Sequence, residues 1–236
     1  LVVDEVHASD AYMTVLLEKL LQAHLKAGGQ AMLLSATLGS SARTRYLSIG
    51  HSKKQAPPSL ANACAAPYPA VSFRNTSGMH LQPVAGNPQH KTVYWETLDA
   101  IDDPVCIATL AAQAAAQGAR VLVVRNTVPA AVATLRALEQ LTLAQGGDWL
   151  FKVNGVSTVH HSRYSRQDRP LLDKAVEAQL GKTRNDSQGR VIIGTQTLEQ
   201  SLDIDADLLI TDLCPMDVLL QRLGRLHRHA RPEAER

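Results

Sequence analysis

Residues 118–143 read GARVLVVRNTVPAAVATLRALEQLTL, and this stretch indicates the fold of most of the chain. The apolar run at 121–124 is short and rich in valine, which is typical of a strand buried on both faces of a sheet. Apolar residues then recur at helical spacing over 129–143, which predicts an amphipathic helix. A buried strand that leads directly into a helix is the repeating unit of a parallel α/β sheet.

The same alternation extends in both directions over 104–228. An alanine-rich helix is expected over 104–117, and another helix over about 168–180. Pro215 is expected to open a last helix, which runs through Arg222. A further strand is predicted at Val156–Val159, and short apolar runs predict buried strands at Val191–Ile193 and Leu208–Ile210. We therefore predict a three-layer α/β lobe with a parallel sheet.

The N-terminal part repeats the pattern once. Leu1–Val3 and Ala31–Leu34 are predicted to be buried strands. Between them, leucines at helical spacing predict a helix that Ser9 or Asp10 caps. A short helix is expected over about 40–49.

Residues 50–92 are rich in Pro, Gly, Ser and Asn, with strand-like pieces at 71–73 and 93–95. A linker between two lobes is expected at roughly 85–100.

The composition fits a soluble globular chain: 236 residues, 45% hydrophobic and 19% charged, with a net charge of +2. That charge neither requires nor excludes nucleic acid as a partner. Three cysteines lie far apart without a C-x-x-C pair, so neither a disulfide framework nor a zinc site is predicted. No run approaches the ~18 apolar residues of a membrane span, and no signal peptide is recognisable, so a cytoplasmic protein without a membrane partner is expected. The chain opens with Leu1 inside an apolar strand, and we expect the protein to extend upstream.

Two carboxylates and a histidine follow the first predicted strand, in the run Asp4-Glu5-Val6-His7. Open α/β sheets bind their ligands at this end of the strands. A nucleotide-hydrolysing motor needs one carboxylate there to hold Mg²⁺ through water and another to orient or deprotonate the attacking water. Asp4 fits the first role and Glu5 the second. Taken alone, the pattern is more typical of a solvated strand end.

Ser35 and Thr37 follow the next predicted strand. Two small hydroxyl residues at that position could bridge His7 to a nucleotide site and respond to bound phosphate. A helix cap is the simpler explanation for the tripeptide by itself.

The most specific pattern is Gln221-Arg222-Leu223-Gly224-Arg225-Leu226-His227-Arg228. Arg225 and Arg228 are three residues apart, so on a helical turn they would project from one face. Two guanidinium groups on one face suit a γ-phosphate, and such arginine fingers contribute about 10³–10⁵ in rate. A basic helix end is the alternative. Because Gln221 and the glycine also fit, the catalytic interpretation is preferred.

Residues 194–205 follow a buried strand and supply candidates for contact with a nucleic acid and with a nucleotide cofactor. Thr195 and Gln196 could contact the sugar-phosphate backbone of a nucleic acid, which fixes register without reading sequence. Asp203 could accept a hydrogen bond from a ribose hydroxyl, and Asp205 is a second candidate for the nucleotide cofactor. The alternative is a loop whose polar residues cap helices.

Two further strand ends offer phosphate contacts. Arg125 and Thr127 end one strand and open a helix, where backbone amides and a hydroxyl form a plausible phosphate seat. Arg163 and Arg169 occupy the corresponding place after the next strand. A simple helix cap explains either group equally well.

Assembled in order, these segments resemble the DExH helicases of superfamily two. The resemblance identifies motif II at Asp4–His7, motif III at Ser35–Thr37, motif IV at Arg125–Thr127, motif V at Gly194–Asp205 and motif VI at Gln221–Arg228. More narrowly, the DEVHA form of motif II and the run Gln-Arg-Leu-Gly-Arg-Leu-His-Arg-His resemble the helicase–nuclease of type I CRISPR–Cas systems.

The resemblance implies an α/β fold of RecA-like parallel sheets with flanking helices: a truncated first lobe at 1–90, a near-complete second lobe at 91–230, and the start of a C-terminal linker at 231–236. It implies ATP and Mg²⁺ between the lobes and single-stranded DNA across both, with movement from 3′ to 5′. It further implies a type I CRISPR surveillance complex as partner, and a histidine-aspartate nuclease domain that is fused or separate.

The chain departs from the pattern because it contains no G-x-x-x-x-G-K-[ST] loop. That loop holds the ATP phosphates, so the chain by itself is expected to bind ATP poorly. The leading hypothesis is a piece of an ATP-dependent single-stranded DNA helicase of CRISPR interference, an antiviral defence. A DExH helicase for RNA or DNA repair is a second reading, and a non-hydrolysing remnant with weak, salt-sensitive DNA binding is a third.

Overall fold

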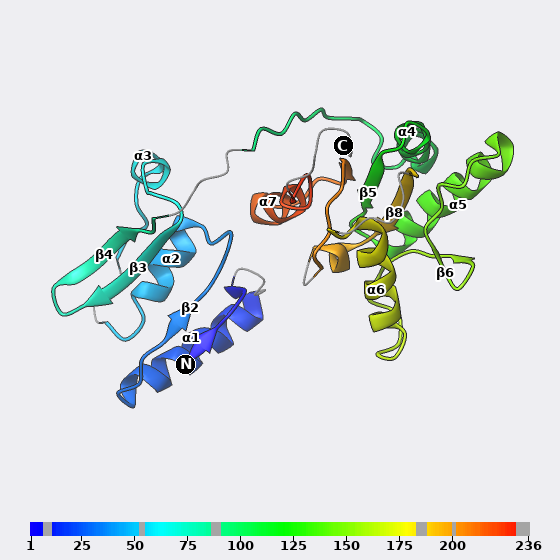
Figure 1. Cartoon of the computed structure of the whole chain (residues 1–236). Coiled ribbons are helices and arrows are strands. Elements are labelled where there is room, and N and C mark those ends of the chain that lie inside the picture. The colour runs from blue at the N-terminus through cyan, green and yellow to red at the C-terminus, as the bar shows by residue number, and fades with distance from the viewer. Residues whose placement is uncertain (7–10, 52–54, 86–90, 183–187, 200–201, 230–236) are drawn as a thin grey trace. The chain divides into compact units, whose positions relative to one another are not determined.

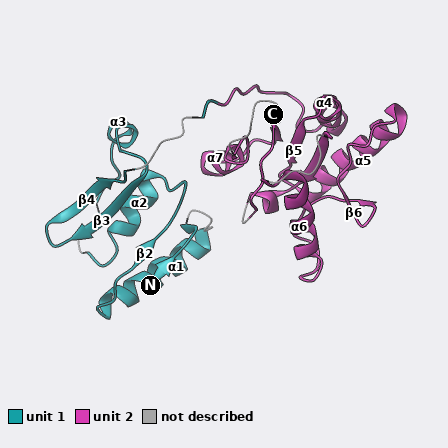
Figure 2. Cartoon of the chain, viewed as in Figure 1, with its two compact units in different colours: residues 1–92 teal, residues 93–236 magenta. Residues whose placement is uncertain are grey.

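The structure is a computed structural model that describes the whole chain except residues 7–10, 52–54, 86–90, 183–187, 200–201 and 230–236. The chain divides into two compact units, Leu1–Thr92 and Val93–Arg236 (Figure 1, Figure 2). The division lies close to the expected lobe boundary at residue 90. The expected caps Ser9 and Asp10 and the expected linker at 231–236 lie outside the described residues.

Unit 1 is built on one strand–helix–strand element. Strand β1 (Val2–Val3) pairs in parallel with β2 (Met32–Leu33), and α1 (Ala11–Lys26) connects them. Leu17 and Leu21 of α1 are buried against this pair, as the helical spacing of the leucines predicts.

The remaining elements of unit 1 are shorter. They are α2 (Ser40–Leu47), α3 (Leu60–Cys64) and an antiparallel hairpin of β3 (Ala70–Asn75) and β4 (Gly78–Pro83). The predicted helix near 40–49 and the strand-like piece at 71–73 are therefore confirmed.

The prediction that both strands of this parallel pair are buried is wrong. Val2 lies opposite Met32 in the register, and the two side chains are 66% and 56% exposed. Val3 and Leu33 are half-buried and pack against the cluster that α1 completes. Because successive side chains alternate between the faces of a strand, α1 covers only one face of the sheet.

The strand-like piece at 93–95 is not a strand in the structure. Tyr94 and Trp95 lie in extended chain and are 94% and 81% exposed. Aromatic residues favour strands because they pack on a pleated surface, but a strand also requires a hydrogen-bonding neighbour. This segment has the composition of a strand and the position of a linker.

Unit 2 is organised around β5 (Arg120–Val124), the middle strand of a three-stranded parallel sheet. Its neighbours are β8 (Arg190–Gly194) and β9 (Leu208–Thr211), and both pairings are parallel. All five residues of β5 are buried, as expected of a central strand. Val121 and Val123 belong to the core on one face of the sheet, and Leu122 and Val124 to the core on the other.

Helices cover both faces of this sheet, which confirms the predicted three-layer α/β fold (Figure 1). One layer contains α4 (Pro104–Ala116) and α5 (Val128–Gln145), whose buried alanines lie against the sheet. The opposite layer contains α6 (Arg169–Leu180), which buries Leu172, Val176 and Leu180. The last helix of the described residues is α7 (Met216–Leu223).

The predicted strand at Val156–Val159 is confirmed for its first two residues, which form β7 (Val156–Ser157). This strand pairs with β6 (Lys152–Val153) in an antiparallel hairpin, so it is not a strand of the parallel sheet. Asn154 and Gly155 form the turn of this hairpin with φ values of 52° and 80°. Asn-Gly is the preferred pair for such a two-residue turn, because both positions require a left-handed backbone. The segments before and after the hairpin lie beside β8, through isolated parallel bridges of Leu150 with Val191 and of His160 with Gly194.

Helix α4 begins at a side-chain cap that can be tested. The Asp103 carboxylate accepts hydrogen bonds from the backbone N–H groups of Val105 and Cys106, at 3.0 and 2.9 Å. We expect Asp103→Ala to lower the free energy of unfolding by about 1 kcal/mol, because two helix N–H groups lose their acceptor. Urea denaturation measures the change. The neighbouring Asp102→Ala, at an exposed position, is the matched control and should stay within ~0.5 kcal/mol of wild type.

Candidate functional site

Asp4 and Glu5 lie at the end of β1 and are exposed. The Glu5 backbone has φ of 55°, in the left-handed region that residues other than glycine rarely adopt. Its N–H donates to the Asp4 carboxylate at 2.9 Å, and the next N–H, from Val6, donates to the Leu34 carbonyl at 3.2 Å. Residues held in such a conformation concentrate at functional sites. His7, the third residue expected here, lies outside the described residues.

Ser35 and Thr37 lie at the same edge of the sheet as the two carboxylates. They follow β2, the parallel neighbour of β1, and the carboxyl ends of parallel strands meet at one edge. The Thr37 N–H donates to the Ser35 hydroxyl at 3.3 Å, so this tripeptide forms a local turn. The topology thus brings together four of the predicted nucleotide-site residues in unit 1.

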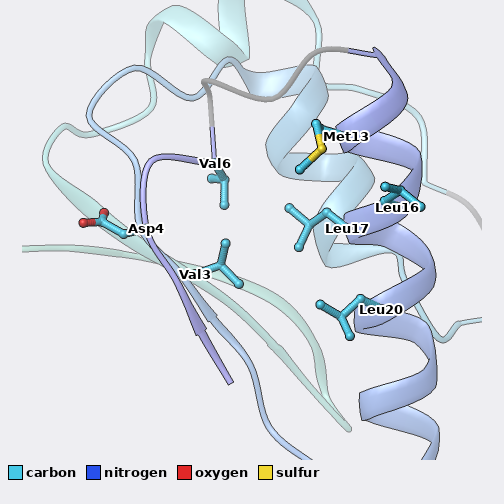
Figure 3. A pocket seen from close by; sticks show the side chains of 7 residues that line it. All are labelled: Val3, Asp4, Val6, Met13, Leu16, Leu17 and Leu20. Atoms are coloured by element: carbon cyan, nitrogen blue, oxygen red, sulfur yellow. The ribbon is translucent and has the colours of Figure 1, made fainter. Parts of the chain in front are cut away.

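An apolar cavity of about 480 Å³ adjoins this edge (Figure 3). Side chains of β1 and α1 point into it, whereas the Asp4 carboxylate points away from the helix. The cavity is lined by Val3, Asp4, Val6, Met13, Leu16, Leu17 and Leu20. Such a lining contains no donor for a phosphate, so the cavity is not itself a nucleotide site. Among the described residues, no group of three or more His, Cys, Asp or Glu side chains is placed to hold a metal ion directly.

In unit 2, the segment of motif VI is not a continuous helix, and the prediction that Arg225 and Arg228 share a helix face is wrong. Helix α7 ends at Leu223, and Leu226 forms a parallel bridge with Ala206. His227 then adopts φ of 41°. Gly224, the residue after α7, still has right-handed helical φ and ψ of −61° and −14°. The chain leaves helical geometry further on, where the Leu226–His227 backbone pairs with Ala206.

The two predicted finger arginines differ in accessibility. The Arg225 guanidinium donates to the backbone carbonyls of Glu199 and Leu202, within unit 2. The Arg228 side chain is 43% exposed and forms an ion pair with Asp203, with Nε and Oδ1 3.0 Å apart. An exposed pair of this kind contributes only about 0–1 kcal/mol. Arg228 and Asp203 can therefore exchange partners at low cost. Gln221, the third residue predicted here, lies half-buried in α7.

Asp205 has a structural role, which corrects its predicted contact with the cofactor. The residue is 1% exposed, and its carboxylate accepts a hydrogen bond from the Arg228 N–H at 2.8 Å. Its own N–H donates to the Leu180 carbonyl at the end of α6. Asp203, two residues earlier, is exposed and remains a candidate for a ribose hydroxyl. Residues 200 and 201, between the two ends of motif V, lie outside the described residues.

Arg125 does not form a phosphate seat, which corrects a second prediction. It is 2% exposed, and its Nε donates to the Asp212 carboxylate at 2.8 Å. Its other nitrogens donate to the Thr134 hydroxyl at 2.7 Å and to the Ile101 carbonyl. Thr127 caps α5 by accepting from the Ala130 N–H at 3.3 Å, which is the alternative that the sequence left open.

The candidates for nucleic-acid contact that remain exposed lie around the short 3₁₀ helix η2 (Gln196–Leu198). Gln196 and Arg163 are exposed, and the Arg169 side chain is 30% exposed. Arg169 donates to the Asp173 carboxylate at 2.9 Å, one turn along α6. Thr195 is 2% exposed, so its predicted contact with nucleic acid is also corrected.

His160, which the sequence did not single out, is completely buried beneath this surface. One ring nitrogen lies 2.8 Å from the Thr197 hydroxyl and the other 2.8 Å from the Asp173 carboxylate. Burial lowers the pKa of His160, although the adjacent Asp173 opposes the shift. A neutral imidazole can bond both neighbours, so it connects η2 to α6.

Arg222 is the second residue that sequence reasoning did not assign. It is 1% exposed, and its Nε donates to the Glu199 carboxylate at 2.7 Å. Burial raises the pKa of Glu199, and the positive charge of Arg222 counteracts the shift. The sequence did offer a signal for its burial: Arg222 lies among the apolar residues of α7, whereas Arg225 and Arg228 follow Gly224, after the helix has ended.

No helix among the described residues is long and apolar enough to cross a membrane.

Several known proteins and solved structures are similar to this chain. The family model described as CRISPR-associated nuclease/helicase Cas3, C-terminal, matches residues 117–231. The CRISPR-associated endonuclease/helicase Cas3 of Escherichia coli K12 is 35% identical over 98% of this chain and 25% of its own length. The CRISPR-associated nuclease/helicase Cas3 of Streptococcus thermophilus is 30% identical over 97% of this chain and 24% of its own length.

Solved structures show the same similarity. The crystal structure of T. fusca Cas3-ATP superimposes with a TM-score of 0.75 at 28% identity, over 100% of this chain and 28% of that one. A chain in a CRISPR RNA-guided surveillance complex, pre-nicking, gives 0.72 at 26% identity, over 100% of this chain and 30% of that one. The chain spans about a quarter of the length of these curated relatives.

The buried position of Arg125 leads to a testable expectation. Arg125→Ala should lower the free energy of unfolding by about 3–5 kcal/mol, because the buried Asp212 carboxylate loses its partner. Arg136→Ala, at an exposed position of α5, is the matched control and should change it by less than ~0.5 kcal/mol. Chemical denaturation measures both. An Arg125→Ala protein as stable as the control would contradict the structural role.

Proposed function

Because this chain is Cas3-like and carries the motifs of a superfamily-two helicase, we propose that it forms part of an ATP-driven single-stranded DNA translocase of CRISPR interference. The observation that carries the proposal is the strand end at Asp4 and Glu5, where two exposed carboxylates follow a parallel strand and one has a left-handed backbone. The similarity of the whole chain to a Cas3 structure named for bound ATP supports the nucleotide as ligand.

The two carboxylates have the chemistry that nucleotide hydrolysis needs. Mg²⁺, when bound with ATP, would neutralise the charge that develops on the phosphates. Asp4 is proposed to hold the ion through water, since a hydrated Mg²⁺ needs few direct protein ligands. Glu5 is proposed to orient the attacking water and accept its proton. Ser35 and Thr37, at the same edge, are proposed to respond to the phosphates.

Motif VI and motif V are proposed to supply the other nucleotide contacts. Arg228 is proposed as the first arginine finger, because its guanidinium is exposed and its only ion pairs in the described chain join it to Asp203. Asp203 is proposed to turn to the ribose hydroxyl when Arg228 leaves it for phosphate. Arg225 can reach phosphate only after it releases the Glu199 and Leu202 carbonyls. It is therefore proposed as the second arginine finger, which reaches phosphate later than Arg228.

Single-stranded DNA is proposed to cross unit 2 near η2. Arg163, Arg169 and Gln196 offer a guanidinium or amide to the sugar-phosphate backbone, which positions a strand without reading its bases. A CRISPR surveillance complex is proposed as partner, since a similar chain occurs in such a complex. A nuclease domain, fused or separate, is proposed from the relatives' names as endonuclease/helicases.

Substitution of Glu5 tests the proposed activity. In the full-length protein that carries this chain, Glu5→Gln should lower DNA-stimulated ATP hydrolysis about 10²–10⁴-fold, because the amide cannot accept the proton of the attacking water. Steady-state phosphate release measures the rate. The exposed Glu96→Gln is the matched control and should hydrolyse ATP as wild type does. A Glu5→Gln protein that keeps the wild-type rate would show that Glu5 is not the base.

A comparison of single-stranded DNA with RNA as the stimulator of ATP hydrolysis separates the DNA helicase hypothesis from the RNA helicase hypothesis.

A further inference from the structure

The side chain of Arg222 is saturated with acceptors from three different segments of unit 2. A guanidinium carries five N–H donors. Here Nε and one Nη lie 2.7 Å from a Glu199 oxygen, in the motif V segment. The other Nη donates to the Thr211 hydroxyl at 2.5 Å and to the Asp212 carbonyl at 3.1 Å, at the end of β9. The remaining contact, at 3.2 Å, is to the side-chain oxygen of Asn126, at the end of β5.

These contacts divide into two kinds. The carboxylate of Glu199 balances the buried charge of Arg222, and breaking such a pair destabilises a fold strongly. The Asn126 oxygen is neutral and is not needed for that balance. Asn126 is also only half-buried, so water could satisfy the guanidinium in its place. Its contribution is therefore better explained by what it connects.

Asn126 connects the proposed DNA surface to the arginine segment. The exposed Gln196 donates its side-chain N–H to the backbone carbonyl of Asn126 at 3.1 Å. Arg222 donates to the Asn126 side chain, and Arg222 lies three residues before Arg225. Arg225 in turn donates to the Glu199 carbonyl, and Glu199 binds Arg222. The bonds form a continuous path from Gln196 to Arg225, one of the two proposed fingers.

A second bond fixes Asn126 in this position. Its side-chain N–H donates to the Leu213 carbonyl at 2.7 Å, and its backbone N–H donates to the Asp212 carboxylate at 2.8 Å. Because both ends of the amide have partners, its orientation is determined, with the oxygen toward Arg222. A displacement of Gln196 by a bound strand would be transmitted to Arg222 through a rigid group.

We propose that Asn126 is a positioning residue that couples DNA bound at Gln196 to the placement of the motif VI arginines. The inference rests on the proposed ATP-driven function. It assigns Asn126 no contact with ATP or with the reacting atoms. Its expected effect is on the factor by which DNA stimulates ATP hydrolysis, not on the fold alone.

The test measures that stimulation factor in the full-length protein, as the ratio of ATPase rates with saturating single-stranded DNA and without DNA. Asn126→Ala removes both side-chain bonds and should lower the factor at least about fivefold, the lower end of usual coupling between sites. Asn126→Asp retains an oxygen acceptor for Arg222 and should keep most of the factor. Loss of folded protein lowers both rates equally, so it leaves the ratio unchanged.

Two further variants complete the design. Thr142→Val removes a buried hydroxyl that donates to the Leu138 carbonyl within α5, and it is the control for destabilisation without an effect on the ratio. Gln196→Ala breaks the other end of the path at an exposed side chain, so it tests the path even where Asn126→Ala does not fold. At saturating DNA it should lower the factor as Asn126→Ala does.

The outcomes separate this inference from the proposed function. If DNA stimulates the wild-type protein and Asn126→Ala has the same stimulation factor, the coupling role is overturned and the proposed function stands. The coupling role is also overturned if the stimulation factor falls in Gln196→Ala but not in a folded Asn126→Ala protein. Gln196 would then act by direct contact with DNA and not through Asn126. A wild-type protein that DNA does not stimulate contradicts the proposed function and, with it, the inference.

Discussion

Strand β5 is hydrogen-bonded in parallel to β8 on one side and to β9 on the other, and all of its residues are buried. Its alternating side chains complete the cores beneath both helix layers, so the three layers of unit 2 depend on its position. The end of this strand presents Arg125 and Asn126 at the edge where parallel sheets bind ligands. The constraints on the core and on the candidate site therefore meet at one strand end.

Buried charge organises that edge. Arg125 is compensated by Asp212 and Arg222 by Glu199, and the two pairs are linked because Arg222 also contacts the Asp212 backbone. A buried guanidinium without such a partner would be very costly, so these polar residues are committed to the fold. Arg163, which lies outside the network, is exposed and available for a ligand. Gln196 is exposed at the margin of the network, where it donates to the Asn126 backbone carbonyl.

Unit 1 contributes a different kind of site. Its two-stranded sheet is covered by α1 on one face, and its carboxyl edge carries the exposed Asp4 and Glu5. The parallel pairing of β1 and β2 brings Asp4, Glu5, Ser35 and Thr37 to one edge. Among the described residues this edge holds no metal ligand cluster. The proposed roles of Asp4 and Glu5 toward Mg²⁺ and water rest on this arrangement, and the sequence contains no G-x-x-x-x-G-K-[ST] loop.

The sequence by itself determined the described α-helices other than α3, the three strands of the unit 2 sheet and the helicase resemblance, because apolar periodicity and motif spacing are local properties. It did not determine which polar residues are accessible. Arg125 and Arg163 both follow predicted strands, yet one is buried against Asp212 and the other is exposed. Likewise, the spacing of Arg225 and Arg228 suggested one helix face, but Leu226 pairs with Ala206 and separates them. Burial and pairing of this kind arise from residues about 20 to 90 positions apart, so only the tertiary structure decides them.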